Sequence, residues 1–255
     1  MNFGGGGLTK TGSGTLTLSG ISTYTGSTVV SNGTLLVNGS LAASNLQVQS
    51  GAALGGYGKI NGNVWINPGS TLAPGIFSPG LTINSNLTLS GNLLLPVNKS
   101  LTPSNTLISV AGTLINNGTG TLTLTNSGPV FALGDTFKLF NQPLVGGSSL
   151  TVVPAPGAGL TWANRLALDG SIAVVLAVNL VPPALGYSVA NGRLNLFWPG
   201  DHLGWRLLVQ TNHLDLGLSG NPTDWDTVAG TALVTATNLP LGTANLNAYY
   251  RLIYP

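Results

Sequence analysis

Short, related phrases recur at a nearly regular spacing along the first part of the chain. The phrase Gly-Thr-Leu begins at Gly14 and begins again at Gly33. Strand-like words that start with asparagine follow at Asn45, Asn63 and Asn86. A repeat of about 20–50 residues is typical of solenoids and related repeat folds, and this spacing lies at the short end of that range. It therefore predicts that each repeat forms one coil of a β-solenoid.

Within each repeat, apolar residues alternate with threonine, serine or asparagine, which is the pattern of a half-buried strand. One such coil cannot bury its apolar face alone, so the next coil must stack about 4.8 Å above it and share a core. The residues predicted to point into that core are Leu16, Leu18, Val29, Leu35, Val37, Leu46, Val48, Val64, Ile66, Leu72, Ile83, Leu87 and Leu89. Identical charges stacked in register repel one another, so ladders of Thr, Ser and Asn are expected on the outside.

Charge is scarce, as this stacking predicts. Charged residues make up 5% of the chain, against about 25% in an ordinary soluble domain. Residues 1–134 carry only Lys10, Lys59 and Lys99, and there is no glutamate. The eight cations are scattered, which argues against a nucleic-acid partner. There is no cysteine for a disulfide or a thiolate metal site, and no run approaches the roughly 20 apolar residues of a membrane helix.

The segment GGLTKTGSGTLTLSGISTYTGSTVVSNGTLLVNG, residues Gly6 to Gly39, resembles the autotransporter-associated β-strand repeat of bacterial passenger domains. The phrases GSTLAPG at Gly69 and GDTFKLF at Gly134 are similar to words that recur downstream of such repeats. The likeness covers roughly residues 4–178. It implies a right-handed parallel β-helix that is exported to the cell surface and has no catalytic residues. The chain begins in mid-pattern, so the export signal is expected upstream of Met1.

The composition changes near Pro182 and Pro183, which form a stiff, extended spacer. We therefore predict a β-solenoid over residues 1–180, a linker over 181–184 and a small antiparallel β-sandwich over 185–255. The tail carries Leu-x-Leu-x-Trp, then Gly-Trp-x-Leu-x-Val-Gln, then Ala-Tyr-Tyr-Arg-Leu. This order resembles a fibronectin type III module, with its last strand missing. The predicted fold is all-β throughout.

The carboxylates available for catalysis are Asp135, Asp169, Asp201, Asp215, Asp224 and Asp226. A glycosidase needs two carboxyl groups about 5–10 Å apart. Only Asp224 and Asp226 are close in sequence with the parity of one strand face. They flank Trp225, which is expected to point into the core, so a solvated strand face or a turn is the alternative interpretation. Asp169-Gly170 is interpreted as a hairpin turn.

The two histidines offer one candidate metal site. His202 follows Asp201 in a loop, and His213 follows the strand-like run RLLVQT. Two histidines and an aspartate can bind zinc, but exposed loop residues are the plainer interpretation. We therefore predict no metal, no cofactor and no catalytic residue, and the chain is not expected to be an enzyme.

The sequence thus favours a non-catalytic structural or adhesin-like protein, secreted or on the bacterial surface. The solenoid is expected to act as a rod or spacer, and the tail as a docking unit. The first alternative is a carbohydrate-binding module or the remnant of a polysaccharide-active β-helix protein. The second is a self-assembling extracellular fibre subunit. Expected partners are cell-surface molecules, glycans, or another copy end to end. The ligand-contact candidates are Trp205, Trp225, Asp224 and Asp226.

Overall fold

The computed structural model describes residues 5–75, 80–212, 216–241 and 247–254. The chain divides into two compact units, Met1–Val175 and Leu176–Pro255. The division falls a few residues before Pro182, where the sequence places a linker.

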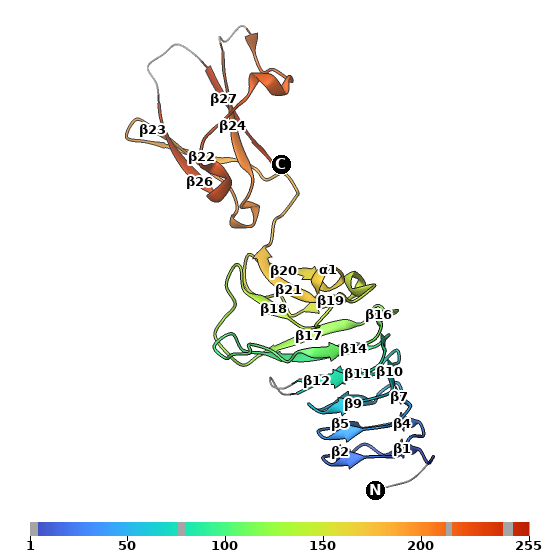
Figure 1. Cartoon of the computed structure of the whole chain (residues 1–255). Coiled ribbons are helices and arrows are strands. Elements are labelled where there is room, and N and C mark those ends of the chain that lie inside the picture. Colours follow the sequence, from blue (N-terminus) through green and yellow to red (C-terminus); the bar gives the residue numbers. More distant parts are fainter. Residues whose placement is uncertain (1–4, 76–79, 213–215, 242–246, 255) are drawn as a thin grey trace. The chain divides into compact units, whose positions relative to one another are not determined.

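The first unit is a parallel β-solenoid with three sheets (Figure 1). Sheet A contains β1 (Leu8–Lys10), β4 (Thr28–Val30), β7 (Asn45–Val48), β10 (Asn63–Ile66), β13 (Leu87–Leu89) and β16 (Leu114–Asn116). Sheet B contains β2 (Thr15–Leu18), β5 (Thr34–Val37), β8 (Ala53–Gly55), β11 (Thr71–Ala73), β14 (Asn92–Val97), β17 (Thr121–Asn126) and β19 (Thr151–Val153). Sheet C contains β3 (Ile21–Ser22), β6 (Ser40–Leu41), β9 (Lys59–Ile60), β12 (Leu81–Ile83) and β15 (Ile108–Val110).

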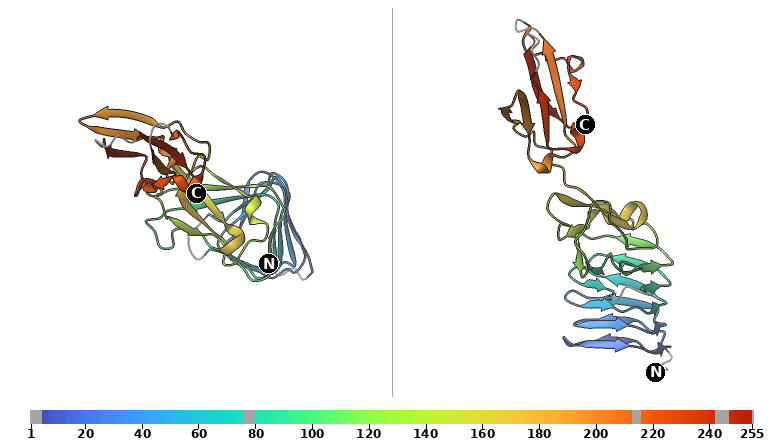
Figure 2. Two further views of the ribbon diagram at one scale, coloured as in Figure 1. Left: turned by 90° about the horizontal axis from the view of Figure 1, so that it is seen from above. Right: turned by 90° about the vertical axis from the view of Figure 1, so that its left-hand side faces the viewer.

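Neighbouring strands in each sheet come from successive coils, so the coils stack directly on one another (Figure 2). The repeated segments that begin at Asn45, Asn63 and Asn86 stack as predicted. Asn63 pairs with Asn45, and β13, which follows Asn86, pairs with β10. In sheet A the register joins Leu8, Thr28, Leu46, Val64, Leu87 and Leu114. The last two steps in this series are longer than the first three because loops are added at the corners between sheets.

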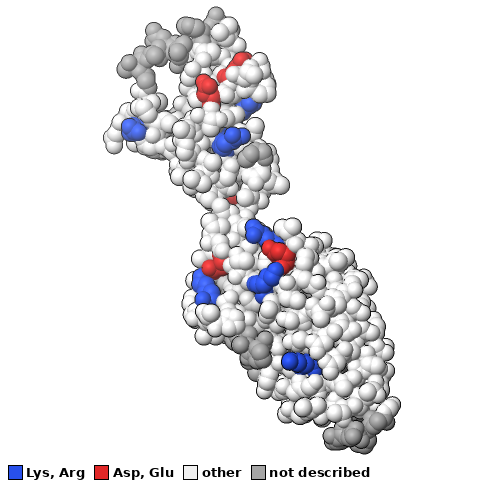
Figure 3. Space-filling model, in the orientation of Figure 1, with Lys and Arg blue, Asp and Glu red and all other residues white. Residues whose placement is uncertain are grey.

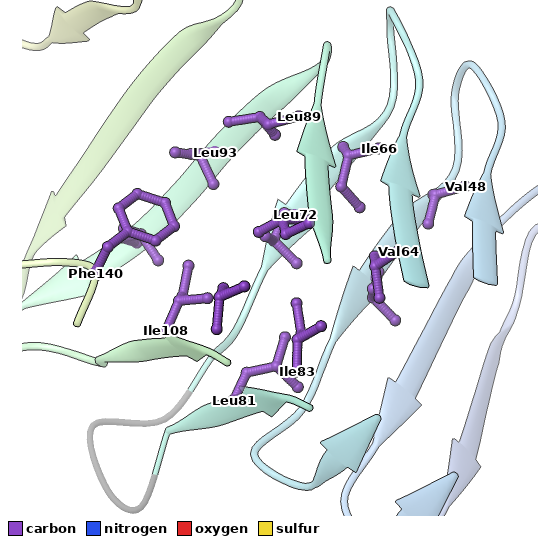
Figure 4. Packing of buried hydrophobic residues seen from close by; sticks show 14 of the residues in the cluster. Val48, Val64, Ile66, Leu72, Leu81, Ile83, Leu89, Leu93, Ile108 and Phe140 are labelled. Atoms are coloured by element: carbon purple, nitrogen blue, oxygen red, sulfur yellow. The ribbon is translucent and has the colours of Figure 1, made fainter. Parts of the chain in front are cut away.

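Aliphatic side chains from all three sheets meet in one continuous core. In sheet B the inward column is Leu16, Leu35, Leu54, Leu72, Leu93 and Leu122. Its members from Leu35 to Leu122 are completely buried. Figure 4 shows Leu72 and Ile66 converging with Ile83 from the third sheet. Burial of each such side chain stabilises the fold by about 1.5–3 kcal/mol.

The inward positions predicted from Leu35 to Leu89 are confirmed, but the prediction for Val29 is wrong. In β4 it is Thr28 and Val30 that point inward, both fully buried. The Thr28 hydroxyl can occupy a core position because it lies 2.7 Å from the Tyr24 hydroxyl, which gives it a hydrogen-bond partner. Burial raises the pKa of Tyr24, and its hydrogen bond to Thr28 opposes that shift.

An antiparallel layer closes the C-terminal end of the solenoid. It contains β18 (Thr136–Lys138), β20 (Leu160–Arg165) and β21 (Ser171–Leu176), with the helices η1 (Gly147–Ser149) and α1 (Leu166–Asp169). Phe131, Phe137 and Trp162 pack edge to face, with ring centres 5.0–6.2 Å apart. The core of the coils continues into this layer without a break. The Asp169-Gly170 hairpin prediction is wrong, because Asp169 ends α1 and Gly170 caps it at a φ of 79°.

The second unit is a small sandwich of two antiparallel sheets. One sheet contains β22 (Gly186–Ala190), β23 (Arg193–Phe197) and β26 (Ala236–Pro240). The other contains β25 (Asp226–Thr227), β24 (Arg206–Asn212) and β27 (Asn247–Ile253). The connections carry the 3-10 helices η2 (Gly200–His202), η4 (Pro222–Asp224) and η5 (Thr231–Leu233). Leu196, Trp198 and Leu207 form its core, with Tyr250 and Leu252 packed against them. Within the described ranges, no helix is long and apolar enough to cross a membrane.

Candidate functional site

Trp225 is buried, with 8% of its surface exposed, directly after η4. Its Nε1 donates a hydrogen bond to the carbonyl oxygen of Ser219 at 3.0 Å. The guanidinium carbon of Arg251 lies 4.1 Å from the ring centre, which is a cation–π contact. The ring is thus covered by a side chain and a loop of the same unit, and it is not a free platform for a ligand.

Asp224 and Asp226 lie on either side of Trp225 and are both exposed. Asp224 is the last residue of η4, and its Oδ2 accepts a hydrogen bond from the Ser219 hydroxyl at 2.5 Å. Asp226 begins β25 and pairs with Val209. The sequence parity predicts that the two carboxylates lie on one strand face. They do not, because Asp224 lies in a helical turn. Their role as ligand contacts stays a prediction.

Trp205 belongs to a hydrogen-bonded cluster that we call the clasp, formed by Asn179, Val181, Asp201, His202 and Trp205. Its indole Nε1 donates to the carbonyl oxygen of Asn179 at 2.8 Å. The backbone N–H of Asn179 donates to the carbonyl oxygen of Asp201 at 2.8 Å, and its Nδ2 donates to Asp201 Oδ2 at 3.0 Å. The clasp therefore fastens the segment around residue 180 to the loop between β23 and β24. Trp205 is 4% exposed, so its visible role is structural.

His202 lies at the centre of the clasp and is buried, in contrast to the exposed loop residue expected from the sequence. Its Nδ1 is 2.7 Å from Asp201 Oδ1, and its Nε2 is 2.7 Å from the carbonyl oxygen of Val181. Both ring nitrogens are therefore within hydrogen-bond distance of an oxygen atom. Neither ring nitrogen is free for a metal ion in this arrangement.

The Asp201 carboxylate is held in its charged form by the clasp. The hydrogen bond from the Asn179 side chain, followed by the hydrogen bond from His202, lowers the pKa of Asp201 below its usual value of 3.8. His213, the second histidine of the candidate metal site, lies outside the described residues, as does Asp215 of the carboxylate inventory. Across the described ranges, no three His, Asp or Glu side chains group to bind a metal.

The exposed aromatic rings of the second unit include Tyr187 and Phe197, which sequence reasoning did not select. Tyr187 is 73% exposed and Phe197 is 48% exposed. Phe197 lies over Gly186 of the paired strand, where a β-carbon would come within 2.4 Å of its ring. The sequence signal that could have identified Phe197 was its position next to Trp198 at the end of β23. Side chains alternate between the two faces of a strand, so only one of two adjacent rings can point into the core.

Most of the few charges of the first unit lie near its closed end (Figure 3), and Lys10 and Lys59 lie in earlier coils. Lys99 Nζ lies 2.8 Å from Asp135 Oδ2, and Lys138 donates to the backbone carbonyl of Asp169. The pKa of Asp169 is lowered, first by the hydrogen bond from the Ser171 hydroxyl. These contacts fix loops at the end of the solenoid.

One family model matches the chain: the passenger-associated-transport-repeat, over residues 8–37. This segment begins with the first residue of β1 and ends with the last residue of β5, so it covers the first coil and most of the second. No curated protein and no solved structure matched the sequence. The match agrees with the stacked parallel strands in the same segment. Residues 8–37 are therefore similar to a passenger-associated-transport-repeat, and they form the first coil and most of the second coil of the β-solenoid.

Proposed function

We propose that the chain is a non-catalytic structural segment of a bacterial surface or secreted protein. The solenoid serves as a rod or spacer, and the C-terminal sandwich serves as a docking unit. The observation that carries this proposal is the passenger-associated-transport-repeat at residues 8–37, built into coils whose outer faces carry hydroxyl and amide groups. A passenger repeat points to export, and a polar, nearly uncharged outer surface suits a stacked rod.

Surface placement is tested in the source bacterium with an epitope tag inserted at the β22–β23 turn, Asn191-Gly192. Proteinase K is added to intact cells, and trypsin is avoided because the chain has only eight Lys and Arg residues. We expect the tag to be lost from intact cells while a cytoplasmic marker survives. A tag that survives until the cells are lysed contradicts the proposal.

The rival function is binding of a carbohydrate. It gains no support from Trp205 and Trp225, because both rings are buried. Its best candidate contact is Tyr187, whose ring is largely exposed on β22. A glycan array screened with the wild-type chain and with Tyr187→Ala separates the two functions. Binding that is lost in the variant supports a lectin-like role, and a blank array with both proteins leaves the structural role.

A further inference from the structure

Asn32 and Gly33 form the corner of the second coil, between β4 and β5. The backbone N–H of Gly33 donates a hydrogen bond to the side-chain Oδ1 of Asn32 at 2.7 Å. The amide carbon of Asn32, Cγ, is one bond away from Oδ1. Rotation about the Cβ–Cγ bond can turn the face of this carbonyl group toward the nitrogen without moving Cγ. The corner therefore holds close together the two atoms that join when an Asn-Gly pair closes a succinimide ring.

Position 33 has room only for glycine. Gly33 has a φ of 69°, in the left-handed region. A β-carbon there would lie 2.4 Å from the carbonyl oxygen of Gly14 in the first coil and 2.8 Å from Nζ of Lys10. The nitrogen of Gly33 is therefore not shielded by a side chain of its own residue, and the ammonium group of Lys10 lies beside it.

Lys10 is bonded to the same peptide group. Its side chain is 8% exposed, and its Nζ donates to the backbone carbonyl oxygen of Asn32 at 3.0 Å and to those of Thr11 and Gly12 at 2.9 and 2.7 Å. When the peptide between Asn32 and Gly33 loses its proton, the negative charge is shared by the nitrogen and this carbonyl oxygen. A nearly buried ammonium group stabilises that charge more strongly than water does. Lys10 therefore favours the nucleophilic form of the Gly33 nitrogen.

Two other Asn-Gly pairs of the solenoid lack this arrangement. In Asn38-Gly39 the glycine N–H donates to the carbonyl oxygen of Leu18 at 2.9 Å, so its nitrogen is directed to the preceding coil. In Asn117-Gly118 the glycine N–H approaches Oδ1 of Asn116, at 3.4 Å. Across the described ranges, Lys10 is the only cation that bonds to the backbone carbonyl group of an Asn-Gly pair. The corner at Asn32 is therefore chemically distinct from corners of the same sequence.

We infer that Asn32-Gly33 is a self-modification site, at which Lys10 promotes the conversion of Asn32 to isoaspartate. The Gly33 nitrogen bonds to Cγ of Asn32, and the side-chain NH₂ group takes up the proton of the Gly33 N–H and leaves as ammonia. Water then adds to one of the two carbonyl carbons of the succinimide ring and breaks the bond of that carbon to the nitrogen. Addition at the former backbone carbonyl leaves the chain joined through Cγ and frees the α-carboxylate of residue 32.

The contact with Lys10 favours this product over ordinary aspartate. The backbone carbonyl of Asn32 is the one that the ammonium group polarises, so water adds there more readily. The α-carboxylate that forms contains the oxygen that already accepts the Lys10 hydrogen bond. The product therefore has an ammonium–carboxylate pair between the first and second coils, where the unmodified chain has an ammonium group on a neutral carbonyl.

The test keeps the purified chain at neutral pH for several weeks and follows each Asn-Gly pair by peptide mass spectrometry. Conversion of an amide to an acid increases the peptide mass, and electron-transfer fragmentation distinguishes isoaspartate from aspartate. We expect Asn32 to convert at least about tenfold faster than Asn38. Asn191-Gly192, in the exposed β22–β23 turn of the second unit, is the internal reference. The isoaspartyl fraction of the product should be higher at Asn32 than at Asn191.

Lys10→Gln keeps a hydrogen-bond donor in the side chain and removes the charge. In this variant the rate at Asn32 should fall at least about tenfold, and its isoaspartyl fraction should fall to that of Asn191, whose own rate stays unchanged. A purely structural role of Lys10 would not move the product ratio. The inference is overturned if Asn32 converts no faster than Asn38 in the wild type. It is also overturned if the variant leaves the rate and the isoaspartyl fraction at Asn32 unchanged.

Circular dichroism checks that the Lys10→Gln variant is folded. If it is not, the wild-type chain unfolded in guanidinium chloride supplies the comparison, because the contacts of Lys10 with Asn32 are lost there. The isoaspartyl fraction at Asn32 should then equal that at Asn191. The same fraction at Asn32 in the native and unfolded chains overturns the inference.

Discussion

The side-chain amide of Asn86 donates a hydrogen bond to the Oδ1 of Asn63, one coil away, at 2.9 Å. Asn63 in turn approaches Asn45 of the preceding coil at 3.4 Å, and it also accepts from the Ser85 hydroxyl at 2.6 Å. The three asparagines begin or precede strands of sheet A, so their amides form a ladder along one corner. In this ladder the polar side chains on the outside of the stack have hydrogen-bond partners in neighbouring coils, without any charged residue.

Removal of the central member of this ladder should destabilise the solenoid. Asn63→Ala leaves Ser85 and Asn86 without their shared acceptor, and we expect a loss of about 1–2 kcal/mol in the free energy of unfolding. Asn61→Ala is the matched control, because the Asn61 side chain accepts an exposed hydrogen bond from Asn84. Urea unfolding followed by circular dichroism compares the two. Equal midpoints for both variants would contradict a structural role for the ladder.

A cavity in the leucine column should cost more than any change on the outer surface. Leu54 is fully buried between Leu35 and Leu72 of the neighbouring coils. Leu54→Ala should lower the free energy of unfolding by about 2–5 kcal/mol. Leu94→Ala removes a partly exposed side chain in β14 and should cost less than about 1 kcal/mol. The same denaturant titration checks both, and a small effect at Leu54 is incompatible with a dry, close-packed core.

The corner at Gly39 admits no side chain. A β-carbon there would lie 2.1 Å from the carbonyl oxygen of Gly20 in the preceding coil, and one at Gly58 would lie 2.1 Å from the carbonyl oxygen of Gly39. Gly39→Ala must therefore push two coils apart, and we expect a loss of at least about 2 kcal/mol. Asn38→Ala, which changes the adjacent residue without adding an atom to the corner, should leave the melting temperature nearly unchanged. Differential scanning calorimetry distinguishes these outcomes.

The clasp makes the stability of the second unit depend on acidity. Because the pKa of Asp201 is lowered in the folded state, the folded unit binds this proton less readily than the unfolded chain does. The stabilisation is complete above the usual pKa of 3.8 and is lost as the pH falls below it, through the folded value.

Tryptophan fluorescence follows this transition through Trp198, Trp205 and Trp225, which lie in the second unit. Asp201→Asn removes the titrating group, so the stability of the variant should depend less on pH between neutrality and pH ~3. Asp226→Asn is the control, because Asp226 is exposed and takes no part in the clasp. A pH profile of Asp201→Asn that matches the wild type would show that the clasp does not contribute.

The repeat determined most of the first unit from the sequence alone. In a solenoid the residue that contacts a given side chain lies one coil away in a similar phrase, so the interval between phrases is also the interval between contacts. Leu35 and Leu72 could therefore be placed in the shared core, and ladders of Thr, Ser and Asn could be expected on the outside, before any coordinates were known. Leu54, which lies between these two leucines in the stack, was not predicted. The proposal of export rests on the same repeat, which the family model matches over residues 8–37.

Tertiary structure decided the features that no repeat encodes. The phrase Thr28-Val29-Val30 fits either parity of a strand. In the fold Thr28 points inward, where its hydroxyl contacts that of Tyr24, and Val29 points outward. His202, Trp205 and Trp225 are buried, and their contacts include Val181, Asn179 and Arg251 respectively. Each of these contacts joins two segments with unrelated sequences, and the number of residues between the two segments is not a repeat interval. Periodicity reports stacking between equivalent residues, whereas contacts between unlike residues become visible only when the chain is folded.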